Sequence, residues 1–120
     1  MGLDIFIFRK KEEKLRNFRK YNFLIPFFEN YGLNVEEQTP LDITKEMASD
    51  LITRCNLVLY DKTLAKQELP TCSGFFFGNT DYNEDYFEAI KDVRDFFNDE
   101  ILKMFEDLDS DETITLQIWY

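Results

Sequence analysis

The sequence predicts an α+β domain in which a small, mainly antiparallel sheet is packed with about three helices. Residues 2–8 and 113–119 show the two-residue hydrophobic period of strands, and segments between them show the helical period of three to four residues. The strands and helices do not alternate regularly, which argues against a parallel α/β sheet. The chain has 120 residues, too few for two self-sufficient cores, so we expect one domain over residues 1–120.

The N-terminal segment is expected to form a strand because it is rich in β-branched and aromatic residues. Leu3, Ile5 and Ile7 share one face, and Phe6 and Phe8 occupy the other. Apolar residues on both faces predict a central strand that is covered on both sides. The C-terminal segment also has one apolar face, and we expect both terminal strands to lie in one sheet because neither would be stable alone.

Residues 12–31 are predicted to form the first helix, followed by a loop over residues 33–41. Gly32 supplies a stop signal at the end of the helix. Pro26 falls inside the pattern and has no N–H group to donate, so a kink or a break is expected there. The apolar positions at helical spacing are Leu15, Phe18, Leu24 or Ile25, and Phe28.

A second helix is predicted from Thr44 to about Tyr60. Thr44 is the expected N-cap, with Asp42 as the alternative. Residues 61–69 fit either a further helical turn or a loop, and Pro70 closes them. The apolar stripe of this helix consists of Met47, Leu51, Cys55 and Val58.

The second half of the chain contains the clearest element, a third helix of about 25 residues before the last strand. Either Asp81 or Asn83 can cap it. A short aromatic strand is predicted just before it, over residues 73–78 between two glycines. The apolar positions of the helix are Phe87, Ile90, Val93 or Phe97, Ile101, Met104 and Leu108.

The formal net charge of −10 is concentrated in one segment. Between Asp81 and Glu112 there are 13 acidic and three basic residues, so this segment carries the whole net charge and the remainder is neutral. A protein that binds DNA or RNA on its own needs a basic surface, so direct nucleic-acid binding is not expected.

Five of these acids form a stripe along the third helix, which we call the acidic ridge. They are spaced by four, four, three and four residues and should be exposed together, opposite the apolar stripe. The ridge consists of Glu84, Glu88, Asp92, Asp95 and Asp99. Such a stripe can be merely solvated, meet a basic partner surface or hold a divalent cation. The acids at 107–112 lack the glycine and distal glutamate of a calcium-binding loop, so no metal is predicted.

Basic residues are concentrated between Arg9 and Lys20, where seven of them are interleaved with aromatic residues. This pattern suits either a nucleic-acid patch or a counter-face for the acidic helix within the same molecule. The second interpretation is favoured because the net charge would repel phosphate.

The sequence contains no histidine, which excludes serine–histidine and cysteine–histidine catalysis and histidine zinc sites. No other catalytic motif is present, so the sequence favours a protein that is not an enzyme, and no cofactor is predicted. Cys55 and Cys72 are far apart without a CxxC context, so two free thiols in a reducing cytoplasm are expected. No segment approaches the roughly 20 apolar residues of a membrane span, so no membrane association is expected.

Residues 69–87 form the most unusual segment, in which two glycines bracket three phenylalanines ahead of a helix start. A core strand that enters a capped helix explains most of the pattern. Alternatively, polar groups of this segment frame a small anion at the helix N-terminus. The residues of this alternative ligand site are Arg19, Asn22, Ser73, Tyr82 and Tyr86.

Three stretches, residues 1–8, 19–22 and 69–87, resemble a family of small uncharacterised proteins from phages and bacterial mobile elements. Its members typically open with MGLDMYLY, carry an RKAN tetrad and contain a segment such as LPTxSGFFFGxTxYDxYYF. They often have a histidine shortly after the tetrad, where this chain has Ile25 or its neighbours. The resemblance implies a phage or prophage context and brings no established activity.

The charge layout and the resemblance together favour a non-enzymatic, acidic interaction protein. Small acidic proteins of mobile elements resemble inhibitors of host defence, including anti-CRISPR proteins, which often occlude a basic groove with acidic side chains. The expected partner is a basic surface of a host protein, bound by the acidic ridge in the host cytoplasm. The alternative is a small-ligand-binding protein or enzyme with a polar site around residues 69–87.

Overall fold

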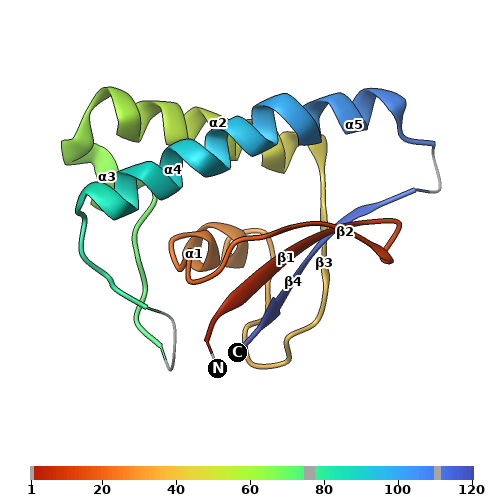
Figure 1. Ribbon diagram of the computed structural model, residues 1–120, viewed down its shortest axis with the longest axis horizontal. Helices are drawn as coiled ribbons and strands as arrows, with labels where there is room; N and C mark the ends of the chain where they lie inside the picture. Colours follow the sequence, from red (N-terminus) through yellow and green to blue (C-terminus); the bar gives the residue numbers. More distant parts are fainter. Residues whose placement is uncertain (1, 75–77, 110–111) are drawn as a thin grey trace.

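The computed structural model describes residues 2–74, 78–109 and 112–120, and it confirms the α+β class. The described part contains a four-stranded sheet in the order β2–β1–β4–β3, in which every neighbouring pair is antiparallel. The long helices lie over one face of this sheet (Figure 1). The strands are β1 (Asp4–Arg9), β2 (Glu13–Asn17), β3 (Leu41–Ile43) and β4 (Ile114–Trp119).

The two terminal strands pair at the centre of the sheet, as the sequence predicted. Their inward side chains are fully buried beneath the helices. Phe6 and Phe8 point to the opposite face, where they keep part of their surface exposed, so the expectation of two covered faces is wrong. The buried cross-strand pairs are Ile5 with Ile118 and Ile7 with Leu116.

Residues 12–17, predicted to begin the first helix, instead form the far side of a hairpin with β1. Lys10 and Lys11 make its turn with positive φ angles of 57° and 63°, the sign that a type I′ turn requires. Such turns usually carry Asn or Gly, so two lysines at these positions do not indicate a hairpin. The first helix is confined to α1 (Leu24–Glu29), and Pro26 fits its first turn because N–H groups there have no intrahelical partner.

The second helix begins and ends as predicted. It is α2 (Lys45–Tyr60), and the hydroxyl of Thr44 accepts a hydrogen bond from the amide of Met47 at 3.2 Å. Residues 61–69 prove to be helical, as a 3-10 turn η1 (Lys62–Leu64) followed by α3 (Ala65–Glu68). The end of the predicted 33–41 loop belongs to β3, a strand too short for a periodic signal. The buried stripe of α2 includes Met47, Leu51, Cys55 and Val58.

The third helix is continuous and contains a π turn that the sequence did not reveal. Asn83 caps it by accepting a hydrogen bond from the amide of Tyr86 at 3.1 Å. The π turn is wider than an α turn, and it places both Phe96 and Phe97 in the core. Its three parts are α4 (Glu84–Phe96), η2 (Phe97–Ile101) and α5 (Leu102–Asp107).

Two expectations about this half of the chain are not confirmed in full. Phe87 and Leu108 are only half-buried, and Leu108 lies just beyond the end of α5, where the backbone is extended. In the predicted 73–78 strand, Ser73, Gly74 and Gly78 are not in strand conformation, and residues 75–77 lie outside the described residues.

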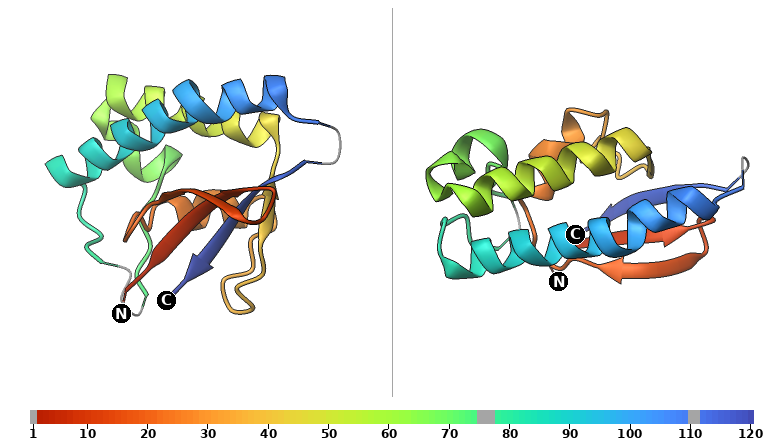
Figure 2. Two further views of the ribbon diagram at one scale, coloured as in Figure 1. Left: turned by 45° about the vertical axis from the view of Figure 1, so that its right-hand side comes forward. Right: turned by 90° about the horizontal axis from the view of Figure 1, so that it is seen from above.

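The core lies between the sheet and the helix layer. Helices α2 and α4 lie side by side over the sheet (Figure 2), and α1 adds buried apolar residues to the same core. None of the helices in the described part of the chain combines the length and hydrophobicity needed to cross a bilayer.

Candidate functional site

The acidic ridge is only partly open to solvent. Glu84, Glu88 and Asp99 are exposed, and none of them forms an ion pair with a described residue. Asp92 and Asp95 are partly buried, with 31% and 49% of their side-chain surfaces exposed. The expectation that all five acids are exposed together is therefore wrong.

Asp92 faces the β1–β2 hairpin instead of solvent. Its carboxylate accepts hydrogen bonds from the Arg16 guanidinium at 2.6 Å and from the Tyr21 hydroxyl at 2.8 Å. Burial, together with the hydrogen bond and negative charge of Asp92, raises the pKa of Tyr21 to about 12. Asp95 is paired with Arg94 of the same helix at 3.0 Å. Two of the five ridge charges are thus compensated within the molecule.

The basic residues of the hairpin serve as the counter-face that the sequence favoured. The carboxylate of Glu112 forms ion pairs with Arg9 at 3.0 Å and with Lys10 at 3.1 Å. The hydrogen bond from Arg9, with further help from Lys10, lowers the pKa of the Glu112 carboxyl. With the Arg16–Asp92 pair, three basic side chains of the hairpin are bound to the acidic half of the chain.

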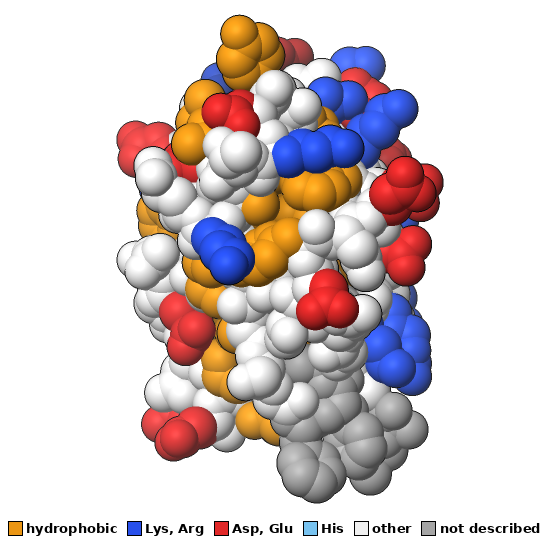
Figure 3. Space-filling model, turned by 90° about the vertical axis from the view of Figure 1, so that its left-hand side faces the viewer, with side chains coloured by type: hydrophobic (Ala, Val, Ile, Leu, Met, Phe, Trp, Pro, Cys, Tyr) orange, Lys and Arg blue, Asp and Glu red, His pale blue; other side chains and the backbone are white. Residues whose placement is uncertain are grey.

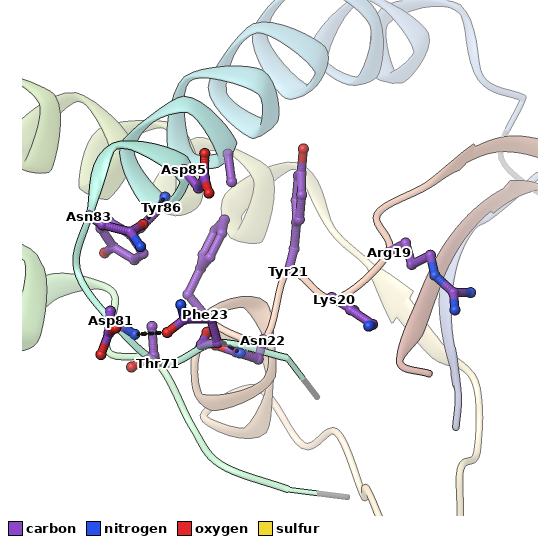
Figure 4. Close-up of a pocket in the computed structure, with 12 residues that line it drawn as sticks. Arg19, Lys20, Tyr21, Asn22, Phe23, Thr71, Asp81, Asn83, Asp85 and Tyr86 are labelled. Carbon is purple, nitrogen blue, oxygen red and sulfur yellow. Dashed lines mark hydrogen bonds between the residues drawn. The ribbon is translucent and has the colours of Figure 1, made fainter. Parts of the chain in front are cut away.

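A pocket of about 210 Å³ lies between the segment that leads into α1 and the segment that leads into α4 (Figure 4). Its first wall consists of residues 19–23. The residues of the second wall are Thr71, Asn79, Asp81, Asn83, Asp85, Tyr86 and Ala89.

The pocket brings together three of the five residues of the alternative ligand site. Ser73 is exposed and does not line it. Tyr82 does not line the pocket either, but its ring meets that of the lining residue Tyr86 at 5.0 Å and its hydroxyl accepts a hydrogen bond from the Thr71 amide at 3.1 Å. The three residues that line the pocket are Arg19, Asn22 and Tyr86.

Two of the three stretches that carry the family resemblance, 19–22 and 69–87, line this pocket, and the third adjoins it through Gly2, which packs against Arg19. A Cβ atom at Gly2 would lie 2.8 Å from Nη2 of Arg19, and one at Gly78 would lie 3.1 Å from Cβ of Lys20. Both contacts are too close for a larger residue without movement. Lys20 itself has a positive φ of 63°, a conformation that costs free energy and persists only where the surroundings fix it.

Hydrogen bonds hold the two walls together. Asn22, which is 2% exposed, donates from Nδ2 to the carbonyl of Asn79 at 3.0 Å. The Cys72 thiol donates to the carbonyl of Asn22 at 3.5 Å, and the Tyr86 hydroxyl donates to the carbonyl of Leu69 at 2.7 Å. Burial raises the pKa of Tyr86 and that of Cys72, the latter to about 11. Neither group is therefore prepared to act as a base or nucleophile near neutral pH.

A chain of aromatic contacts connects the pocket to the core. The ring of Tyr21 stacks on Phe18 at 5.4 Å and on Phe23 at 5.8 Å, and Phe23 meets Tyr86 edge to face at 5.6 Å. Phe23 and Tyr86 are buried, and Tyr21 is half-buried. These packed rings give the pocket fixed apolar walls.

Several polar residues of the pocket were not predicted from the sequence. Lys20 stands inside the tetrad that carries the resemblance, and Asp81 and Asp85 fall within residues 69–87. The stretches were therefore identified, but the side chains that face the pocket depend on how two distant segments approach each other.

The end of the molecule that contains α3 and the start of α4 is not uniformly acidic. Figure 3 shows a band of hydrophobic side chains there, bordered by both acidic and basic side chains. The ammonium of Lys62 lies 4.9 Å from the ring centre of Phe87, and that of Lys66 lies 5.8 Å from that of Tyr82. The acidic excess thus lies along α4 and not over this whole end.

The cysteines, the potential metal-ligating side chains and the comparisons with known proteins do not indicate a specific activity. Cys55 and Cys72 are free thiols, as expected, and burial raises the pKa of Cys55 to about 12. Within the described ranges, no three or more cysteine, aspartate or glutamate side chains are grouped to hold a metal ion. The chain matches no protein-family model, no curated protein and no solved structure.

Proposed function

We propose that the protein is a non-enzymatic interaction protein that binds a basic partner surface through the exposed part of the acidic ridge. In the phage context that the resemblance implies, the partner is a host defence protein or a nucleic-acid-binding protein. One observation supports this: Glu84, Glu88 and Asp99 stay exposed and form no ion pair with the described residues, although the hairpin supplies Arg16 to Asp92 of the same ridge.

The physical basis of the proposed binding is the negative charge along α4 that no basic side chain in the described part of the chain compensates. Like charges on a helix face destabilise it slightly, and of the three exposed acids only Glu84, in the first turn of α4, is stabilised by the helix dipole. They do accelerate association with a basic surface, and salt screens this attraction over about 8 Å at physiological ionic strength. Binding through the ridge should therefore be fast and sensitive to salt.

The first prediction tests the ridge against a variant of equal net charge. Reversing three exposed acids to lysine changes the formal net charge from −10 to −4, because each reversal adds two charges. The control reverses three exposed acids away from the ridge, including one in the first turn of α2 to match Glu84. The ridge variant is Glu84→Lys, Glu88→Lys, Asp99→Lys. The control variant is Glu36→Lys, Glu37→Lys, Glu46→Lys.

The measurement is the association rate with a partner captured from host lysate by the wild-type protein, taken at low and high salt by surface plasmon resonance. The ridge variant should associate more slowly and lose most of the salt dependence, whereas the control should stay close to wild type. Equal slowing of both variants would mean that only net charge matters. Unchanged rates in the ridge variant would refute the proposal.

A second function, small-ligand binding, is favoured by the meeting of two of the resembling stretches, 19–22 and 69–87, at one pocket. Its volume of about 210 Å³ is below the roughly 300–1,000 Å³ of pockets that hold drug-sized ligands or cofactors. The ligand would therefore have to be a small molecule or part of a larger one.

A further inference from the structure

The pocket lies beside the N-terminal end of the exposed ridge, because Asp85 lines it and Glu84 immediately precedes Asp85 in α4. We infer that this pocket receives one arginine side chain of the basic partner. The inference rests on the proposed function, to which it adds a specific anchoring residue on the partner.

The size of the pocket suits a single side chain. At about 210 Å³ it is too small for most free ligands, whereas a protein partner can insert one residue and place the rest of its surface along α4. Interfaces commonly concentrate their binding energy in such an anchor, and arginine is among the residue types that are enriched there.

The polar groups that remain available in the pocket favour a cation. The carboxylates of Asp81 and Asp85 are exposed and form no hydrogen bond or ion pair with the described residues. By contrast, the side-chain oxygens of two pocket asparagines are already used. That of Asn79 accepts a hydrogen bond from the Asp81 amide at 2.7 Å, and that of Asn83 accepts one from the Tyr86 amide at 3.1 Å. An anion would meet two carboxylates at close range and a capped helix start.

The two cations of the first wall do not neutralise these carboxylates. Arg19 is bound to Asp4 at 3.2 Å, and Lys20 packs its methylene groups against Gly78. In Figure 4 the side chains of Arg19 and Lys20 point away from α4, whereas Phe23 extends toward Asp85. The side of the pocket next to α4 is therefore acidic and aromatic.

Aromatic walls favour arginine over lysine. Tyr21, Phe23 and Tyr86 all line the pocket, and although Phe23 and Tyr86 are only 2% and 6% exposed, the half-buried Tyr21 keeps part of its surface open. A guanidinium is flat, stacks on rings and donates two parallel hydrogen bonds to one carboxylate. An ammonium is a more strongly hydrated point charge and uses such a site less well.

The test is a titration of the ¹⁵N-labelled protein with N-acetyl-arginine amide, followed by NMR. N-acetyl-lysine amide and the neutral isostere N-acetyl-citrulline amide are the comparison probes. Amide signals of Asn22, Asn79 and Asp85 should move with arginine and saturate with a Kd on the order of 1–10 mM, as one anchored side chain allows. The lysine probe should bind more weakly, and the citrulline probe should produce no saturable shift.

A double variant, Asp81→Asn with Asp85→Asn, should weaken the arginine response at least about tenfold. The matched control, Glu36→Gln with Glu37→Gln, removes the same charge elsewhere and should respond as wild type does. If the double variant melts at a lower temperature by circular dichroism, the single Asp85→Asn variant provides the comparison. Equal shifts with citrulline, or larger shifts with inorganic phosphate, overturn the inference.

Failure of this inference differs from failure of the proposed function. If the arginine probe does not bind but the ridge variant still slows partner association, the ridge proposal stands and the pocket assignment falls. If the probe binds but the ridge variant associates at the wild-type rate, the ridge proposal falls and the pocket remains an arginine site without the ridge.

Discussion

At the scale of single residues, the β1–β2 turn combines two lysines in a conformation that L-residues avoid. Lys10 and Lys11 have φ angles of 57° and 63°. A left-handed residue other than glycine costs about 1–2 kcal/mol, and asparagine tolerates this region better than lysine does. We predict that Lys11→Asn raises the free energy of unfolding by about 0.5–1 kcal/mol, and the melting temperature by about 2–5 °C. Lys10 is kept because it contacts Glu112.

Lys11→Ala is the control, because alanine removes the same charge but does not favour a positive φ. Both variants are compared by thermal and urea unfolding followed by circular dichroism. An equal gain in the alanine variant would show that the lost charge, and not the turn conformation, is the cause.

Single-residue signals in the sequence worked where the interaction is local. Thr44 was predicted as a cap and Asn83 as one of two candidates, because an N-cap bonds an amide only three residues further along the chain. The lysine turn could not be predicted, because pairing with β4 and contacts to Glu112 compensate its strain, and these contacts lie about a hundred residues away.

At the scale of elements, the helix from Glu84 to Asp107 depends on the side chains at its π turn. Phe97 is fully buried and contacts Phe96 and Phe18 at ring distances of 5.7 and 6.5 Å. We predict that Phe97→Ala lowers the free energy of unfolding by about 3–5 kcal/mol, because truncating a core aromatic loses apolar burial and leaves a cavity. Urea unfolding measures this loss.

Phe87→Ala provides the comparison within the same helix. Phe87 is half-buried beneath Lys62, so its truncation loses less buried surface and can be filled by water. A loss at Phe87 as large as that at Phe97 would mean that the buried face of the helix is assigned wrongly.

Elements were predictable in proportion to their length. The helices beginning after Thr44 and Asn83 extend over several turns, so their apolar stripes repeat often enough to define a face. β2 and β3 are short and lie at the two edges of the sheet, where few positions are buried. In the region of β2, Leu15 and Phe18 are also three residues apart and therefore fitted a helical spacing by coincidence.

At the scale of the whole molecule, the stretches around the candidate pocket could be predicted from the sequence, but the side chains that line it could not. The hydrogen bond from Asn22 to Asn79 joins residues 57 positions apart. The family resemblance identified the two stretches that contain these residues, 19–22 and 69–87. Only the fold shows that Asp81 and Asp85 line the pocket, and that Arg19 is directed toward Asp4.

The order of the sheet makes the C-terminal strand essential to the whole fold. β4 pairs with both β1 and β3, so its loss leaves β3 without a neighbour and β1 paired only with an edge hairpin strand. Its inward side chains are at most 1% exposed. We predict that deletion of residues 113–120 abolishes the cooperative thermal transition, because an isolated hairpin cannot support the helix layer.

The control for this deletion is Trp119→Ala, which changes the same strand at a side chain that is 62% exposed. That variant keeps the backbone pairing of β4 and should melt cooperatively within a few degrees of wild type. A truncated chain that still melts cooperatively near the wild-type temperature would show that the helices and the β1–β2 hairpin fold without the central strand. The pairing of the two chain ends would then contribute little, and the packing of α2 against α4 would have to account for the stability of the domain.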